Sequence, residues 1–323
     1  MILKPCINRF NYLYLNPMKQ WFIIFLITMT LQAISQELKI EQKGRYISIR
    51  SGNYAMKINA GLGARIVSLT LKSKEVLADK YRLNPNYGST LWFSPQRYWD
   101  WPPSRTLNKG KYDVKTDEKT VVLTSKICHR TGLQFVKTIS FDSVLEAFVI
   151  RYSIINNGWK EQVIAPWEVT RIRKGCRVFF PLGKKAPLNH FLYTYNTWHY
   201  SDAEEPECEG LKTVDGMFDL TVDDRKHSDW FKYYADGAEG WIACQRNDLL
   251  FVKRFEDNDY SVLPPDQGEA EVYRHTKHYI EVEQHGRYTR LKPGERMEWE
   301  VLWYVREVKG NADRIFVNKI LKR

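Results

Sequence analysis

Two carboxylates and an imidazole alternate near the C-terminal end of the chain, in the segment Tyr279–His285, YIEVEQH. Residues two apart on a β-strand point to the same side, so Glu281, Glu283 and His285 are expected to share one face. Two carboxylates on one face repel each other, which can raise one pKa into the range useful for acid–base catalysis. The same spacing also fits a polar strand edge whose carboxylates face solvent and have no chemical role.

A second group of candidate residues lies in the aromatic segment Leu91–Lys109, LWFSPQRYWDWPPSRTLNK. Its members are Trp92, Gln96, Arg97, Trp99 and Trp101. Indole rings offer apolar faces to sugar C–H groups, and amide and guanidinium groups hydrogen-bond to hydroxyls in a concave pocket. The segment therefore predicts either a sugar pocket or a loop that plugs one end of the fold.

Trp167 and Glu168 form a third candidate pair, within the mostly apolar stretch APWEVT. A carboxylate buried in such a stretch needs a partner. We expect Glu168 either to bind a ligand beside Trp167 or to form an ion pair with Arg171 or Arg173.

Several other classes of function lack support in the sequence. Nucleotide-binding loops of the GxxxxGK[ST] and GxGxxG types are absent, as are the HExxH and GxSxG motifs. The cysteines show no CxxC spacing, so we predict no metal site and no cofactor. The net charge is +11, but the basic residues are dispersed and form no long run, which argues against a nucleic-acid partner.

Short alternating apolar stretches with Gly, Pro and Asn between them predict an all-β sandwich or barrel. The expected strands are 46–49, 54–58, 64–71, 121–124, 133–139, 147–154, 163–170, 178–181, 240–245, 249–255, 279–284 and 298–305. Residues 312–321 fit a short final helix. We interpret Leu91–Lys109 and Asn189–Ser228 as long irregular segments. The absence of a linker or an internal repeat predicts one domain over residues 36–323.

The N-terminal region has the order of a secretory signal. Met18 and Lys19 precede an apolar run, and Ala33 and Ser35 supply small residues for cleavage. We therefore expect residues 1–35 to be a signal peptide with its start at Met18, an extension before it, and a secreted or periplasmic mature protein without stable membrane insertion. The alternative is an uncleaved membrane anchor.

Cleavage after Ser35 would leave four cysteines in the mature chain, Cys128, Cys176, Cys208 and Cys244. In an oxidising compartment this even number permits two disulfides of unassigned pairing. Four buried thiols are the alternative.

Two further stretches of sequence resemble the galactose-mutarotase-like (aldose 1-epimerase-like) superfamily. Residues 63–69, GARIVSL, followed by Glu75-Val76-Leu77, resemble the opening hairpin of these proteins, and 291–295, LKPGE, followed by Trp299 and Trp303, resembles their closing turn and last core strand. The likeness spans residues 40–305 and is strongest to a secreted branch distinct from true aldose 1-epimerases. It implies a β-supersandwich with a sugar pocket on a concave face.

The resemblance also assigns roles to individual residues. In active members a Glu removes the proton of the anomeric hydroxyl, and this Glu maps to Glu281 or Glu283. A His protonates the ring oxygen, but Trp167 lies near its place here. His190 is similar to a family Asn-His pair, and His285 is another candidate acid.

These features predict a protein that binds a mono- or oligosaccharide, or a weak, atypical epimerase. The alternatives are a structural or partner-binding β-sandwich and a polysaccharide lyase or hydrolase accessory domain. A lyase would use Tyr98 as base and Arg97 to neutralise a uronate.

Overall fold

The computed structural model describes residues 37–80, 86–99, 101–184, 189–194, 197–201, 210–221, 230–275 and 278–322, with side chains omitted for 189–201, 230 and 275. Residues Leu38–Arg323 form one compact unit. The expected signal peptide and Cys208 lie outside the described residues. None of the described helices is long and apolar enough to cross a bilayer.

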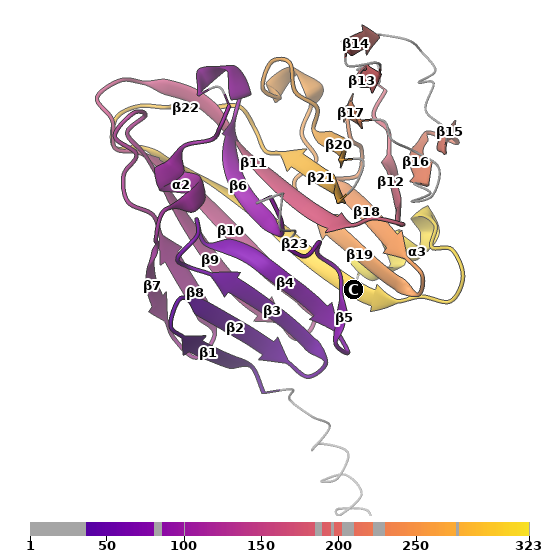
Figure 1. Cartoon of the computed structure of the whole chain (residues 1–323), viewed down its shortest axis with the longest axis horizontal. Coiled ribbons are helices and arrows are strands. Elements are labelled where there is room, and N and C mark those ends of the chain that lie inside the picture. Colours follow the sequence, from indigo (N-terminus) through magenta and orange to yellow (C-terminus); the bar gives the residue numbers. More distant parts are fainter. Residues whose placement is uncertain are drawn as a thin grey trace, which may run out of the picture. The chain divides into compact units, whose positions relative to one another are not determined.

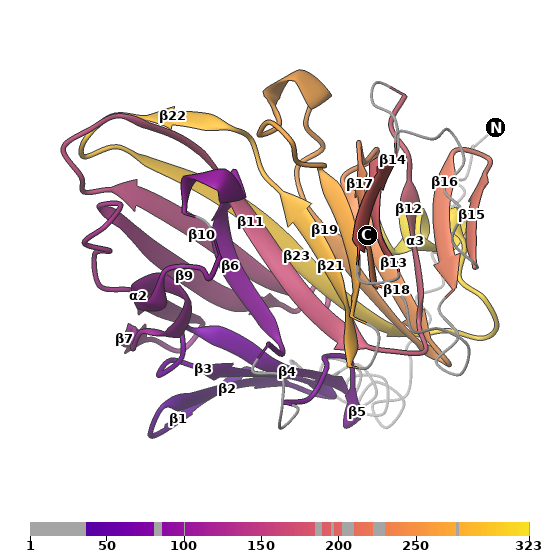
Figure 2. The same ribbon diagram turned by 45° about the horizontal axis from the view of Figure 1, so that its top comes forward.

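The described strands form two antiparallel sheets, of 13 and 10 strands (Figure 1, Figure 2). This confirms the all-β sandwich expected from the sequence. The larger sheet follows the order β1 (Lys39–Lys43), β2 (Tyr46–Ser51), β3 (Tyr54–Asn59), β4 (Arg65–Leu71), β6 (Ser89–Ser94), β11 (Gln162–Arg173), β21 (Tyr279–His285), β20 (Ala270–His275), β17 (Trp230–Ala235), β13 (Asn189–Thr194), β14 (Thr197–Ser201), with β5 (Lys74–Glu75) and β22 (Thr289–Leu291) on its margins.

The second sheet lies behind the first and is built mainly from the long strands near the middle and end of the chain. Its order is β15 (Leu211–Val214), β16 (Met217–Thr221), β12 (Arg177–Pro181), β18 (Trp241–Arg246), β19 (Leu249–Arg254), β23 (Arg296–Glu307), β10 (Ala147–Asn156), β9 (Leu133–Asp142), β8 (Thr120–Thr124), β7 (Asp113–Thr116). Two short α-helices, α2 (Arg105–Lys109) and α3 (Arg314–Leu321), and two 3-10 turns, Gln96–Tyr98 and Tyr260–Val262, complete the described elements. In α3 the Asp313 side chain accepts the Phe316 N–H and caps the helix.

Successive side chains of β11 point alternately into the core and to the opposite side of the larger sheet. Glu168 contacts Tyr152 and Trp303 of the second sheet, so the even-numbered side chains of β11 point into the sandwich. Trp167 and Arg171 therefore point away from the second sheet. Directly paired residues of neighbouring antiparallel strands share a face, which extends this side across β6, β21, β20 and β17.

We call this side of the larger sheet the polar face. It carries Trp92 of β6, Trp167 and Arg171 of β11, Glu281, Glu283 and His285 of β21, Glu271 and Tyr273 of β20, and Lys232 of β17. The core on the other side is mostly apolar, as in the edge-to-face contact of Phe93 with Phe135, whose ring centroids lie 6.5 Å apart.

Two sequence predictions about irregular segments are wrong. Within Leu91–Lys109, residues up to Ser94 belong to β6, and the segment ends in α2. Every residue of β6 is buried, so the strand shows no alternation of apolar and polar positions, which was the signal used. Within Asn189–Ser228 the backbone forms β13, β14, β15 and β16. These are short strands near the ends of the two sheets.

Three cysteines are buried thiols in the structure, namely Cys128, Cys176 and Cys244. The alternative of buried thiols therefore holds for these three. Cys244 lies on β18, and Cys176 directly precedes the neighbouring strand β12, whose Val178 pairs with Cys244. Burial raises the pKa of the Cys244 thiol well above its usual value, which keeps it in the unreactive protonated form at neutral pH.

Candidate functional site

A lysine between two carboxylates forms the centre of the polar face. The Lys232 ammonium lies 2.7 Å from Glu271 and 3.0 Å from Glu283. It also lies 5.0 Å above the centroid of the Trp167 ring and 5.2 Å from that of Tyr234. The Trp167 indole N–H donates to Glu283 at 2.8 Å. Strands β11, β21, β20 and β17 thus each contribute to one connected group of charges and rings.

The two carboxylates that share Lys232 have opposite shifts of pKa. Burial raises the pKa of Glu283 to about 7, against the lowering effect of Lys232. For Glu271, burial is outweighed by Lys232 and His285, which lower its pKa to about 2. One carboxylate therefore stays ionised, while the other can exchange a proton near neutral pH, as acid–base chemistry requires.

His285 lies beneath this group and is fully buried. Its Nε2 is 3.1 Å from Glu271, and its Nδ1 is 3.0 Å from the Ser94 hydroxyl. The Trp167 ring stacks on it with centroids 5.0 Å apart. Burial lowers the pKa of His285. The imidazole is therefore covered by Trp167 and engaged at both nitrogens.

Arg171 and Glu281 form the second ion pair of the polar face, with Nε 2.7 Å from the carboxylate. The guanidinium also lies 5.3 Å from the centroid of the Trp92 ring. The side chain of Glu281 is 10% exposed and that of Lys232 is 16% exposed, whereas Glu283 is 1% exposed. Glu281 and Lys232 are thus the charged groups of these two pairs that solvent, or a ligand, reaches.

Tryptophan rings continue the polar face toward the loop after β6. Trp92 contacts Trp167 edge-on at 5.1 Å, and it contacts both Trp99 and Trp101 at 5.9 Å. Trp99 is buried, and its N–H donates to the Phe93 carbonyl. Trp101 is 56% exposed. The segment therefore combines the two expected roles, because Trp99 fills the end of the fold while Trp101 remains accessible.

The other candidates of that loop turn toward a neighbouring loop. Arg97 forms an ion pair with Asp266 at 2.6 Å. The Tyr98 hydroxyl bonds to that of Tyr288 at 2.7 Å. Gln96 is half-buried in the same turn. Trp101, Trp167, Glu281 and Glu283 thus lie in one connected cluster, while Arg97 and Tyr98 lie at its margin.

Glu168 is part of the core, and the prediction that it pairs with Arg171 or Arg173 or binds a ligand is wrong. Its carboxylate lies 2.8 Å from Lys253 of the second sheet, and it also accepts hydrogen bonds from Tyr152, Gln284 and Trp303. Arg171 pairs instead with Glu281, and Arg173 with Asp79. Strand alternation explains the difference, because Glu168 and both arginines point to opposite sides of β11.

Sequence reasoning missed Lys232, Glu271 and Ser94. Lys232 alternates with the apolar Phe231 and Tyr233 in WFKYYA, and Glu271 stands beside Val272 in AEVYRH. This alternation could have identified both strands, but not the strand order that brings them to Glu283. His190 lies on β13, and its side chain is outside the described residues.

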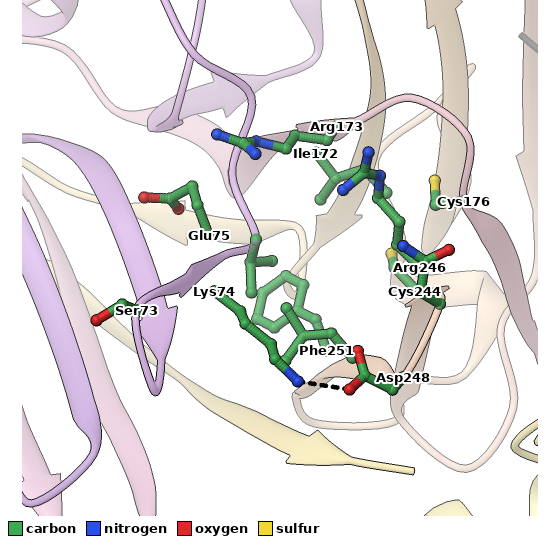
Figure 3. A pocket seen from close by; sticks show the side chains of 13 residues that line it. Ser73, Lys74, Glu75, Ile172, Arg173, Cys176, Cys244, Arg246, Asp248 and Phe251 are labelled. Atoms are coloured by element: carbon green, nitrogen blue, oxygen red, sulfur yellow. Dashed lines mark hydrogen bonds and ion pairs between the residues drawn. The ribbon is translucent and has the colours of Figure 1, made fainter. Parts of the chain in front are cut away.

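A separate cleft of about 440 Å³ lies at the other end of β11 (Figure 3). Lys74 and Asp248 form an ion pair across it at 2.5 Å, and Phe251, Cys176 and Cys244 line its interior. The cleft shares no lining residue with the polar face. Two of its basic residues are already paired, Lys74 with Asp248 and Arg173 with Asp79, and it lacks the aromatic rings of the polar face.

Comparison with protein families identifies the chain. The profile described as Domain of unknown function (DUF4380) matches residues 93–306. The chain belongs to the DUF4380 family. The matched region begins near the end of β6 and ends in β23, so it contains β11, β17, β20 and β21, while Trp92 of β6 lies just before it. A comparison with curated protein sequences found no match.

Solved structures place this DUF4380 protein in the galactose-mutarotase-like fold. A galactose mutarotase-like protein from Lactobacillus casei is 13% identical, with a TM-score of 0.54 over 81% of this chain and 100% of its own. A galactose mutarotase related enzyme from Lactobacillus acidophilus is 8% identical, with a TM-score of 0.53 over 82% and 99%. The TM-scores, over most of both chains, show a shared fold.

A third similar structure is longer than this chain. A TPR-domain containing protein from Parabacteroides distasonis is 16% identical, with a TM-score of 0.56 over 83% of this chain. The match covers 49% of that protein, so the present chain corresponds to about half of its length.

Proposed function

We propose that the DUF4380 protein binds a carbohydrate on its polar face. The observation that carries this proposal is that two charged groups of opposite sign, Glu281 and Lys232, are partly exposed on the polar face, above the buried rings of Trp92 and Trp167. Sugar hydroxyls donate to carboxylates and accept from cations. The galactose-mutarotase-like fold of the relatives is consistent with such a ligand.

The charge balance of the face favours a neutral sugar. Arg171 is paired with Glu281, and Lys232 is shared by Glu271 and Glu283. A uronate would place its carboxylate against cations that already have carboxylate partners, with repulsion from the latter. A hydroxyl can bridge an existing ion pair without adding charge.

Calorimetric titration with D-glucose, D-galactose and D-galacturonate tests the proposal. We expect saturable binding of at least one neutral sugar and weaker binding of D-galacturonate. Glu281→Gln should weaken binding about tenfold or more, because it removes a charged hydrogen-bond acceptor. Glu298→Gln, on an exposed position of β23, is the matched control and should leave affinity unchanged. Absence of binding to all three sugars would contradict the proposal.

We expect mutarotation to be slow. Ring opening needs a base at the anomeric hydroxyl and an acid at the ring oxygen, and loss of one general acid typically costs ~10²–10⁴-fold. Trp167 holds the place assigned to the acid and covers His285. Burial raises the pKa of Glu283 to about 7, but its side chain is 1% exposed, so Glu281 is the carboxylate that can reach the anomeric hydroxyl.

Polarimetry of freshly dissolved α-D-glucose and α-D-galactose measures this directly. The expected rate enhancement is small and is abolished by Glu281→Gln, with Glu283→Gln as the comparison. A rate typical of efficient mutarotases would show that another group supplies the acid.

We also propose that residues 1–35 are a signal peptide and that the mature protein is secreted or periplasmic. The Lys19 charge, the apolar run and the Ala33 and Ser35 positions support this order. N-terminal sequencing of exported material should begin near Gln36. Recovery of the full-length chain from the cytoplasm alone would refute it.

A further inference from the structure

The rim of the polar face is built from three chain segments that contact one another. The loop between β6 and α2 meets the loop before β20 through Arg97 and Asp266, 2.6 Å apart. It meets the turn after β21 through the hydroxyls of Tyr98 and Tyr288, 2.7 Å apart. In Figure 1 the turn that follows β6 stands beside the loop that leads into β20. Two polar contacts from consecutive residues fix the position of the first loop against the larger sheet.

An exposed ring extends from this rim. Trp101 is 56% exposed, yet its edge packs against Trp92, which in turn packs against Trp167. The three indoles form a continuous row from the buried ion pairs to solvent. Tyr98 is 50% exposed in the same loop. The accessible part of this row therefore lies outside the area that the Lys232 and Glu281 side chains occupy.

We propose that Trp101 is a second sugar subsite and that the natural ligand is an oligosaccharide, with one ring over the ion pairs and another stacked on Trp101. This inference rests on the proposed function and extends it to a ligand class. A single sugar ring that engages Glu281 and Lys232 uses only the inner part of the indole row. A further ring linked to it reaches Trp101, which lies in the same loop as the exposed side chains of Arg97 and Tyr98.

The rigid rim favours stacking. Aromatic side chains give a large contact area at a small cost in conformational entropy. The packing of Trp101 on Trp92 reduces that cost further, because the ring already has a fixed neighbour. A loop that only closed the fold would need Trp99, which is buried, but not the half-exposed Trp101.

Calorimetric titration of the full chain with paired probes tests the subsite. The probes are D-glucose with cellotetraose and D-galactose with β-1,4-galactotetraose. At least one tetrasaccharide should bind about tenfold more tightly than its monosaccharide, as expected for an added aromatic contact. Trp101→Ala should remove this difference and change monosaccharide affinity less than about twofold. Trp159→Ala, at an 81% exposed tryptophan outside the rim, is the matched control and should keep the difference.

The outcomes separate this inference from the function on which it rests. Equal affinities for monosaccharide and tetrasaccharide, or an equal loss of both in Trp101→Ala, would overturn the subsite and leave sugar binding intact. Binding of none of the four probes would overturn both. Thermal unfolding of each variant identifies a folding defect. Tyr98→Phe is a milder variant of the same rim, because it removes only the hydroxyl that bonds to Tyr288. It should reduce only the tetrasaccharide affinity.

Discussion

Replacing Glu168 by leucine is expected to lower the free energy of unfolding by about 3–5 kcal/mol. The carboxylate is fully buried and neutralises Lys253, which is also fully buried, at 2.8 Å. Glu168→Leu leaves that ammonium without a carboxylate and leaves the donors of Gln284 and Trp303 unpaired. Removal of one partner of a buried ion pair costs far more than removal of both. Urea denaturation monitored by tryptophan fluorescence measures the change.

A double variant isolates the uncompensated charge. Glu168→Leu with Lys253→Met should be about 2 kcal/mol more stable than Glu168→Leu alone, because the buried cation is gone. The loss of unfolding free energy in Glu168→Leu, relative to the unmodified protein, should also shrink as pH rises. Burial already lowers the pKa of Lys253, and without Glu168 its folded-state pKa falls further below the unfolded value. Stability is then gained as pH rises through that interval. A double variant no more stable than the single one would refute the role of Lys253.

Much of the fold follows from local sequence. In β9 and β10 buried positions alternate with more exposed ones along most of each strand, and the segments 133–139 and 147–154 were predicted from the matching sequence pattern. Glu281 and Glu283 were predicted to share a face because the spacing alone decides it. The same pattern did not predict β6, because both sides of this strand are covered, one by the second sheet and the other by tryptophan rings such as Trp167.

The partners of charged residues did not follow from the sequence. Glu168 was paired with the nearest arginines, but its partner Lys253 lies 85 positions away on the other sheet. Lys232 is likewise 51 positions from Glu283. Such contacts depend on the order of strands and on which side of each strand faces the core, and a local pattern carries no information about strand order. The resemblance to mutarotase-like proteins predicted the type of fold but did not identify which charged side chains pair.

Replacing Lys232 by methionine should destabilise the protein in a strongly pH-dependent manner. The variant keeps the length of the side chain but leaves Glu271 and Glu283 without their shared cation. At pH 8 we expect a loss of about 3–5 kcal/mol in the free energy of unfolding, as for other broken buried pairs. At pH 5 the loss should fall to about 1 kcal/mol, because neutral carboxylic acids need no counterion.

The direction of this pH dependence follows from the pKa values of the two carboxylates. In the native protein the pKa of Glu271 is depressed to about 2, so its contribution is present above its unfolded pKa and is lost only as pH falls toward 2. Without Lys232, burial and the second carboxylate raise both pKa values above the unfolded ones. Stability is then highest at acid pH and is lost as pH rises through the raised values.

Two comparisons make the Lys232 prediction specific to the buried group. Lys72→Met removes an exposed ammonium paired with Glu307 and should produce no measurable pH-dependent change. Adding Glu283→Gln to Lys232→Met should recover part of the loss at pH 8, since one of the two uncompensated charges is removed. An equal loss at pH 5 and pH 8 would mean that Lys232 acts through the packing of its stem between the Trp167 and Tyr234 rings rather than through its charge. Chemical denaturation at both pH values distinguishes these cases, because a packing defect has no proton linkage.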